Sequence, residues 1–194
     1  MSESNKNIKE VIRSEYIKCM SSPSYFIKKY CFISHPMRGR IPFHLYKFQE
    51  QTLDLIKRDQ NSIILKSRQL GISTLVAAYI LWLILFFEDK NVLVIATKQD
   101  TAKNMVTKVT FMYDNLPTWM KSKDKPKEKN KLSLKLNNNS QVKASSAAGD
   151  AGRSEACSLL VFDECISGDN RVELKNNKTG EIKLVSLEEL YNNG

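Results

Sequence analysis

The chain has 194 residues, of which 42% are hydrophobic, so it is long enough to bury one core of ordinary size. Its longest apolar run covers residues 75–87, whereas a membrane-spanning helix needs roughly 20 apolar residues, which argues against a membrane protein. The formal net charge is +9, and residues 1–164 carry 26 basic and 16 acidic side chains while residues 165–194 carry 4 and 5. The basic excess therefore lies in the first part of the chain and favours a polyanionic partner such as nucleic acid.

The N-terminal third is predicted to begin with helix and to continue as irregular chain. Residues 1–30 alternate charged and apolar positions at helical spacing, and residues 31–48 are interrupted by two prolines and a glycine, which predicts an extended, looped segment. Residues 62–67, with the sequence SIILKS, are predicted to form a short strand, and a long buried helix should follow as far as Phe87.

Strands and helices continue to alternate further along the chain. Residues 91–97 (NVLVIAT) predict a second buried strand, and residues 99–113 predict a helix. The lysine-rich residues 121–131 can bury nothing and predict a solvated loop, with DNA contact as the alternative. Two short strands around the turn NNNS predict a hairpin, and residues 158–162 (SLLVF) predict a third buried strand. This order is typical of a parallel α/β sheet.

The segment LKSRQLGISTL lies between the first predicted strand and the long helix, where phosphate-binding loops occur. The general pattern GxxxxGK[ST] holds phosphate with backbone N–H groups and a lysine, and its hydroxyl binds magnesium. Gly71 and Ser73 match this pattern, but Ile72 stands at the lysine position. Lys66 and Arg68 lie just upstream, where long side chains can reach the phosphates from the other side; the alternative is that both are surface charges.

Two carboxylates follow the third predicted strand, in the sequence LLVFDE. On a parallel strand they lie at the carboxyl edge of the sheet, where ligands of such sheets bind. Asp163 would then hold magnesium together with Ser73, and Glu164 would orient the attacking water.

Four segments of the chain, in their order, resemble the ATPase domain of tailed-phage terminase large subunits, the motors that package DNA. These segments are FISHPMRGRIPFHLYKFQ, LKSRQLGISTL, NVLVIATKQDTAKNM and GRSEACSLLVFDEC. The resemblance covers residues 25–165. It implies an incomplete P-loop (RecA-like) parallel sheet with helices on both faces. It also implies that Phe48 and Gln49 contact adenine, with Gln49 reading the base edge, that Ser73 and Asp163 bind Mg²⁺, and that Glu164 is the catalytic carboxylate. The expected ATP-binding residues are Phe48, Gln49, Lys66, Ser67, Arg68, Gln69, Leu70, Gly71, Ile72, Ser73 and Thr74.

The same resemblance implies the partners of the protein. These are double-stranded DNA, the portal and the small terminase subunit, with a homo-oligomeric ring, in the cytoplasm of the bacterial host. Arg153 would reach the nucleotide of a neighbouring subunit, or else is an exposed loop arginine. The four cysteines lack CxxC spacing, which fits a reducing compartment.

Residues 165–194 follow a different plan. RVELKN and EIKLV predict a hairpin with Gly180 in its turn, and SLEEL predicts the start of a helix capped by Ser186. The segment resembles the N-terminal piece of a split intein, whose opening motif would be Cys165, Asp169 and Val172. This resemblance implies that Cys165 is the splicing nucleophile, that a partner polypeptide supplies the rest of the intein and terminase, and that splicing needs no cofactor. The alternative is an ordinary terminase loop with an accidental stop.

The expected organisation is therefore a helical segment (residues 1–30), part of an ATPase domain (31–164) and an intein segment of hairpin and helix (165–194). The first hypothesis is a precursor that is inactive alone and becomes an ATPase after trans-splicing at Glu164/Cys165. A helicase-type DNA-translocating ATPase fragment and a non-catalytic basic DNA-binding fragment are the two alternatives.

Overall fold

The computed structural model describes residues 3–59, 61–66, 69–96, 98–121, 125–146, 156–163, 171–175 and 182–186. The chain divides into two compact units, Met1–Asp163 and Glu164–Gly194. The first unit begins with three helices and a small hairpin. Its elements are α1 (Glu3–Ser21), α2 (Pro23–Tyr30), β1 (Phe32–His35), β2 (Gly39–Pro42) and α3 (Lys47–Arg58).

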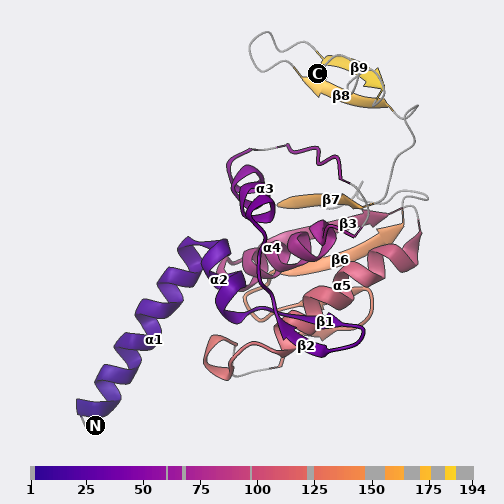
Figure 1. Ribbon diagram of the computed structural model, residues 1–194. Helices are drawn as coiled ribbons and strands as arrows, with labels where there is room; N and C mark the ends of the chain where they lie inside the picture. The colour runs from indigo at the N-terminus through magenta and orange to yellow at the C-terminus, as the bar shows by residue number, and fades with distance from the viewer. Residues whose placement is uncertain are drawn as a thin grey trace. The chain divides into compact units, whose positions relative to one another are not determined.

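The rest of this unit builds the main sheet and the two helices that pack on it (Figure 1). In chain order the elements are α4 (Ile72–Phe86), β3 (Asn91–Ala96), α5 (Gln99–Asp114), the 3₁₀ helix η1 (Thr118–Met120), β4 (Glu128–Lys129), β5 (Ser133–Lys135), β6 (Gln141–Ser146) and β7 (Leu159–Asp163). These elements confirm the predicted strand at residues 91–97 and the predicted helix at residues 99–113. They also confirm the hairpin around NNNS and the strand before Asp163.

The sheet has the strand order β4-β5-β6-β3-β7. Strand β3 pairs in parallel with both β6 and β7, whereas β4, β5 and β6 pair antiparallel. The predicted α/β class is confirmed, and the parallel part is the three strands β6, β3 and β7. The antiparallel edge arises because short connections join its strands, which a hairpin permits and a parallel pair does not.

Helix α4 is the centre of the hydrophobic core. Nearly all its side chains are apolar, and eleven of them are buried against the other helices and the sheet. The indole Nε1 of Trp82 donates a hydrogen bond of 2.9 Å to the Cys19 carbonyl in α1, so the one polar atom of this side chain is satisfied. None of the described helices is long and apolar enough to cross a membrane, although α4 is apolar on every side.

The C-terminal end of α4 is capped by the turn between β5 and β6. Asn138 Nδ2 donates to the carbonyls of Ile84 (2.9 Å) and Phe87 (3.0 Å), and Ser140 Oγ donates to the Phe87 carbonyl at 2.6 Å. These side chains satisfy carbonyl groups that have no partner inside the helix.

We expect Asn138→Ala to lower the free energy of unfolding by about 1–3 kcal/mol, because it removes the side-chain donor to the Ile84 carbonyl and one of the two donors to the Phe87 carbonyl. Denaturant titration measures this loss. Asn137→Ala is the matched control: its Nδ2 donates to the exposed Lys125 carbonyl, so a smaller effect is expected. Equal losses for the two variants would refute the capping role.

Helices α1 and α2 are joined through the carboxylate of Glu15. Its Oε1 accepts hydrogen bonds from Lys29 Nζ (2.7 Å), Tyr30 Oη (2.7 Å) and Tyr25 Oη (2.9 Å). The bond from the Lys29 ammonium, followed by that from the Tyr30 hydroxyl, lowers the pKa of Glu15 to about 2. The carboxylate therefore stays ionised, and keeps the two helices together, at every pH near neutrality.

Two sequence-based expectations for residues 31–66 were incomplete or wrong. The looped segment contains the antiparallel pair β1–β2, and helix α3 was not predicted. Residues 62–66 are not a strand: they pair with none of the described strands. A strand forms only where a neighbour takes its backbone hydrogen bonds, and the local apolar pattern cannot show whether that neighbour is present. The lysine-rich loop likewise contains the two-residue strand β4.

The second unit contains an antiparallel hairpin formed by β8 (Arg171–Lys175) and β9 (Ile182–Ser186). Its register pairs Val172 with Val185 and Leu174 with Lys183, which confirms the predicted hairpin. Gly180 and the predicted helix after Ser186 lie outside the described residues.

Candidate functional site

The site is built where the chain enters α4. Gln69 and Gly71 have positive φ angles of 64° and 72°, and Gly71 precedes the first helical residue, Ile72. The first backbone N–H groups of a helix have no partner inside it and point along its axis out of the N-terminal end, where they can bind an anion. The Ile72 side chain is buried in the core, so the position that holds lysine in the general pattern contributes only backbone here.

Ser73 and Asp163 are in direct contact, although 90 positions separate them. Ser73 Oγ, in the first turn of α4, donates a 3.0 Å hydrogen bond to Asp163 Oδ1, the last residue of β7. The parallel pairing of β7 with β3 sets Asp163 at the carboxyl edge of the sheet, beside Ala96. A hydroxyl and a carboxylate at this distance are oxygen ligands of the kind that magnesium prefers, with positions left for water and phosphate.

Gln49 connects α3 to the turn before α4. Its Oε1 accepts from the Tyr46 backbone N–H at 3.0 Å, and its Nε2 donates to the Leu70 carbonyl at 3.1 Å. The side chain is only 2% exposed, and a Cβ added at Gly71 would lie 3.0 Å from its Nε2. The amide therefore holds the turn against α3, and glycine at position 71 leaves room for this close approach.

Beside this link, two aromatic rings offer an exposed platform. The rings of Tyr46 and Phe48 are stacked, with centroids 5.7 Å apart and an interplanar angle of 8°, and both side chains are exposed. Flat exposed rings are suited to stacking on a planar base. The sequence prediction named Phe48 but missed Tyr46. The available signal was the spacing of Tyr46 and Gln49, which are three residues apart, as in a capping box at the start of a helix.

We expect Gln49→Ala to weaken binding of ATP and GTP to the same extent, because both functional groups of its amide already bond within the protein. Titration of the two nucleotides measures this. The prediction that Gln49 reads the adenine edge stays a prediction, and a loss confined to ATP would support it and contradict equal weakening. Gln51→Ala, on the exposed side of the same helix, is the matched control.

Several predicted site residues are not brought into contact by the described structure. The Lys66 side chain is exposed, and the Thr74 side chain is partly buried in the first turn of α4. Six of the predicted residues lie outside the described residues: Ser67, Arg68, Arg153, Glu164, Cys165 and Asp169. The choice between Lys66 and Arg68 as the main phosphate contact thus stays open. The described residues contain no group of three or more His, Cys, Asp or Glu side chains that could hold a metal ion.

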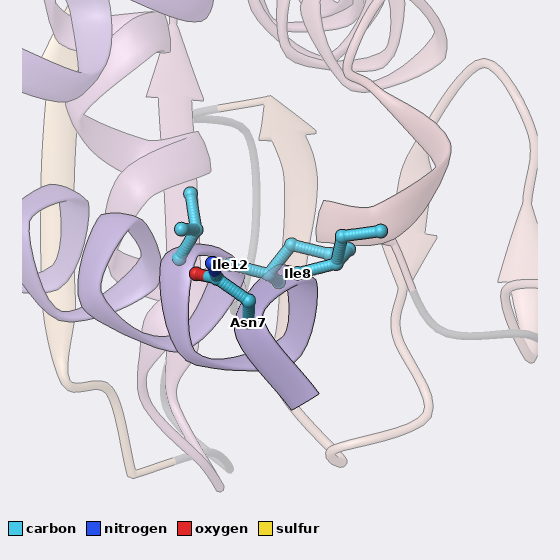
Figure 2. A pocket seen from close by; sticks show the side chains of 4 residues that line it. Asn7, Ile8 and Ile12 are labelled. Carbon is cyan, nitrogen blue, oxygen red and sulfur yellow. The ribbon is translucent and has the colours of Figure 1, made fainter. Parts of the chain in front are cut away.

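A surface hollow elsewhere in the chain is not part of this site. Figure 2 shows it along α1, lined by Asn7, Ile8, Val11 and Ile12. All four residues come from one helix, and Asn7 is the single polar side chain among them. The hollow therefore lacks the converging polar groups that fix a small ligand.

Comparison with known proteins first defines the fold. The crystal structure of the HK97 bacteriophage large terminase is similar, with a TM-score of 0.57 and 20% sequence identity. The matched region covers 75% of this chain and 31% of that chain, so this chain spans about a third of the length of the HK97 protein. At this identity the likeness establishes the mixed α/β fold, in which a sheet is flanked by helices.

The family follows from the sequence match. Residues 63–179 match the family model described as "Terminase large subunit, T4likevirus-type, N-terminal", so the chain belongs to this terminase family. The predicted terminase resemblance is confirmed. The matched range ends beyond Cys165, whereas the compact units divide after Asp163.

Proposed function

We propose that this chain is the nucleotide-binding N-terminal piece of a DNA-packaging ATPase. The contact between Ser73 and Asp163 supports this most directly, because it joins the start of a helix to the carboxyl end of a parallel strand. Phosphate-binding sites with a magnesium ion need these two elements together. The positive charge of residues 1–164 adds a reason to expect double-stranded DNA as the polymer that is moved.

In this proposal each group has a separate task. The N–H groups at the start of α4, with Lys66 or Arg68, bind the phosphates of ATP, and the Tyr46–Phe48 platform binds the base. Ser73 and Asp163 would hold Mg²⁺, which neutralises charge on the phosphates when bound. Glu164, next to Asp163, orients a water molecule for attack on the terminal phosphate. Assembly into a ring with portal and small-subunit partners belongs to the same proposal.

We further propose that residues 165–194 join this piece to a second polypeptide by trans-splicing. The Cys165 thiol attacks the Glu164 carbonyl carbon; the C–S bond forms, the C–N bond breaks, and the amine of Cys165 takes the proton. A nucleophile at the start of the second terminase piece then takes over the acyl group. Asparagine cyclisation releases the intein, and an amide bond forms between the pieces. The unit boundary after Asp163 and the separate β8–β9 hairpin support this reading.

Binding of magnesium and ATP tests the site itself. We expect a fluorescent ATP analogue to bind more tightly with Mg²⁺ than without it, and Ser73→Ala to reduce the magnesium-dependent part of the affinity by about tenfold, or ~1.4 kcal/mol. Ser14→Ala, which is exposed on α1, is the control and should bind as the unmodified chain does. Magnesium dependence that survives Ser73→Ala in full would contradict the assignment.

A further inference from the structure

Three segments of the chain meet at the C-terminal end of α5, and each of them brings a cation. The β1–β2 hairpin lies beside this helix (Figure 1), and Arg40 Nη1, in β2, donates a 3.0 Å hydrogen bond to Asn115 Oδ1. Lys121 Nζ donates to the Asp114 carbonyl at 3.0 Å, and Lys129 Nζ, in β4, pairs with the Asp114 carboxylate at 2.6 Å. Cations that are distant in the sequence therefore form one basic surface.

This surface continues along the residues that lead into β4. Lys125 and Lys127 are exposed, and two hydrogen bonds tie this stretch to the turn between β5 and β6. Asn137 Nδ2 donates to the Lys125 carbonyl at 3.1 Å, and Lys127 Nζ donates to Asn139 Oδ1 at 2.6 Å. The Asn139 amide is neutral and does not cancel the lysine charge. Arg38 is also exposed, in the turn of the β1–β2 hairpin. We call these side chains together the basic edge: Arg38, Arg40, Lys121, Lys125, Lys127 and Lys129.

Stability of the fold accounts for only part of this charge. Cations near the C-terminus of a helix interact favourably with its dipole, which is one reason for Lys121 and Lys129. Lysine on a short edge strand prevents pairing with another chain, which is a second reason for Lys129. Neither reason applies to Arg38, Lys125 or Lys127, because they lie outside β4 and make no contact with the helix end among the hydrogen bonds described above. Three exposed cations therefore remain for a partner.

The aromatic rings beside the basic edge are covered by its cations. The Arg40 guanidinium lies 4.9 Å from the centroid of the Phe32 ring, and Lys121 Nζ lies 5.8 Å from that of the Tyr113 ring. Proteins that hold single strands use open aromatic rings that stack on the bases, whereas lysine and arginine bind the phosphates of a duplex whatever its sequence. The chemistry of the basic edge therefore fits the backbone of double-stranded DNA.

The basic edge and the nucleotide site lie at opposite edges of the sheet. Asp163, the last residue of β7, pairs with Ala96, the last residue of β3, at the carboxyl edge. The turn at residues 137–140 instead leads directly into β6, whose first residue, Gln141, pairs with Asn91, the first residue of β3. Nucleotide and DNA can therefore occupy the chain at the same time.

We infer that the basic edge binds the phosphate backbone of double-stranded DNA, without reading its sequence, at a site separate from the nucleotide site. The inference rests on the proposed function for its choice of DNA, and it adds the surface that contacts this polymer. Each phosphate contact releases counterions from the duplex, so the affinity falls steeply as the salt concentration rises.

Binding of a short fluorescent DNA duplex of mixed sequence to the full chain, measured over a series of salt concentrations, tests this inference. The double variant Lys125→Gln/Lys127→Gln should bind about tenfold more weakly at low salt, and the slope of log K against log salt should become shallower by about two, because two phosphate contacts are lost. Arg38→Gln, in a separate segment, should make the slope shallower by about one.

The matched control removes the same charge from another surface. Lys9→Gln/Lys18→Gln changes two exposed lysines of α1 and should leave the affinity and the slope nearly unchanged. Circular dichroism confirms that each variant is folded, and Arg38→Gln decides the result if the double variant in the basic edge is not. Equal weakening in the two double variants would show that only net charge matters and would overturn the inference.

Binding of a fluorescent ATP analogue to the same variants separates this inference from the proposed function. ATP binding without duplex binding would overturn the basic edge as a DNA site and leave the nucleotide site in place. Duplex binding through the basic edge by a chain that binds no ATP would support the inference and contradict the proposed function. Loss of ATP binding in Lys125→Gln/Lys127→Gln would contradict the separation of the two sites. Tighter binding of a single strand than of the duplex would overturn the choice of double-stranded DNA.

Discussion

Cys165→Ala should abolish both products that form when the chain is mixed with its partner polypeptide. These products are a protein that joins residues 1–164 to the downstream terminase piece and a released peptide of residues 165–194. The thiolate is the attacking species, and an unperturbed cysteine has a pKa of roughly 8.5, so the reaction also needs a base and a strained amide from the partner. The chain alone should stay intact. Intact mass of the mixture over time measures all three species.

Cys157→Ala is the control for this experiment. Cys157 is exposed, as a reactive thiol would have to be, but it lies in the first unit, before the junction. Cys19 and Cys31 cannot compete, because both are buried and burial raises the pKa of each thiol, that of Cys19 to about 11. Ligation that persists in Cys165→Ala would refute the mechanism, and loss of ligation in Cys157→Ala would show that the wrong thiol had been chosen.

Glu164→Gln should leave ATP binding intact in the joined protein and reduce turnover by about 10²–10⁴-fold. The amide keeps the shape of the side chain but removes the charge that orients and polarises water. Phosphate release at saturating ATP measures turnover, and nucleotide titration measures binding. Glu10→Gln, an exposed glutamate of α1, should affect neither. Turnover near that of the unmodified protein would assign the catalytic carboxylate to another residue.

The predicted parts of the fold are those that local pattern determines. Helices α4 and α5 and strand β3 are long apolar or periodic stretches, and the β5–β6 hairpin has a run of turn-forming residues between its strands. The contact of Ser73 with Asp163 was also predictable, because the sequence places Ser73 in a phosphate-loop pattern at the start of a helix and Asp163 at the carboxyl end of a buried strand. The phosphate-loop pattern and the pair of carboxylates already indicated which hydroxyl and which carboxylate to pair.

The features that were missed depend on distant parts of the chain. Gln49 and Leu70 are 21 positions apart, and only the path of the chain between α3 and α4 brings them together. The stack of Tyr46 on Phe48 is local by contrast, and it depends on the backbone turn into α3. Residues 62–66 carry the apolar pattern of a strand, but a strand needs a neighbour, and none of the described strands takes that place.

The central claim is that this chain is one piece of a two-piece ATPase. The most direct test compares ATP hydrolysis by the purified chain with ATP hydrolysis by the joined protein. We predict background hydrolysis by the chain alone, because none of the described strands pairs with the outer edge of β7 or with residues 62–66. We predict magnesium-dependent turnover by the joined protein. Magnesium-dependent turnover by the chain alone, lost in Ser73→Ala, would contradict the claim and show that the site is complete without a second polypeptide.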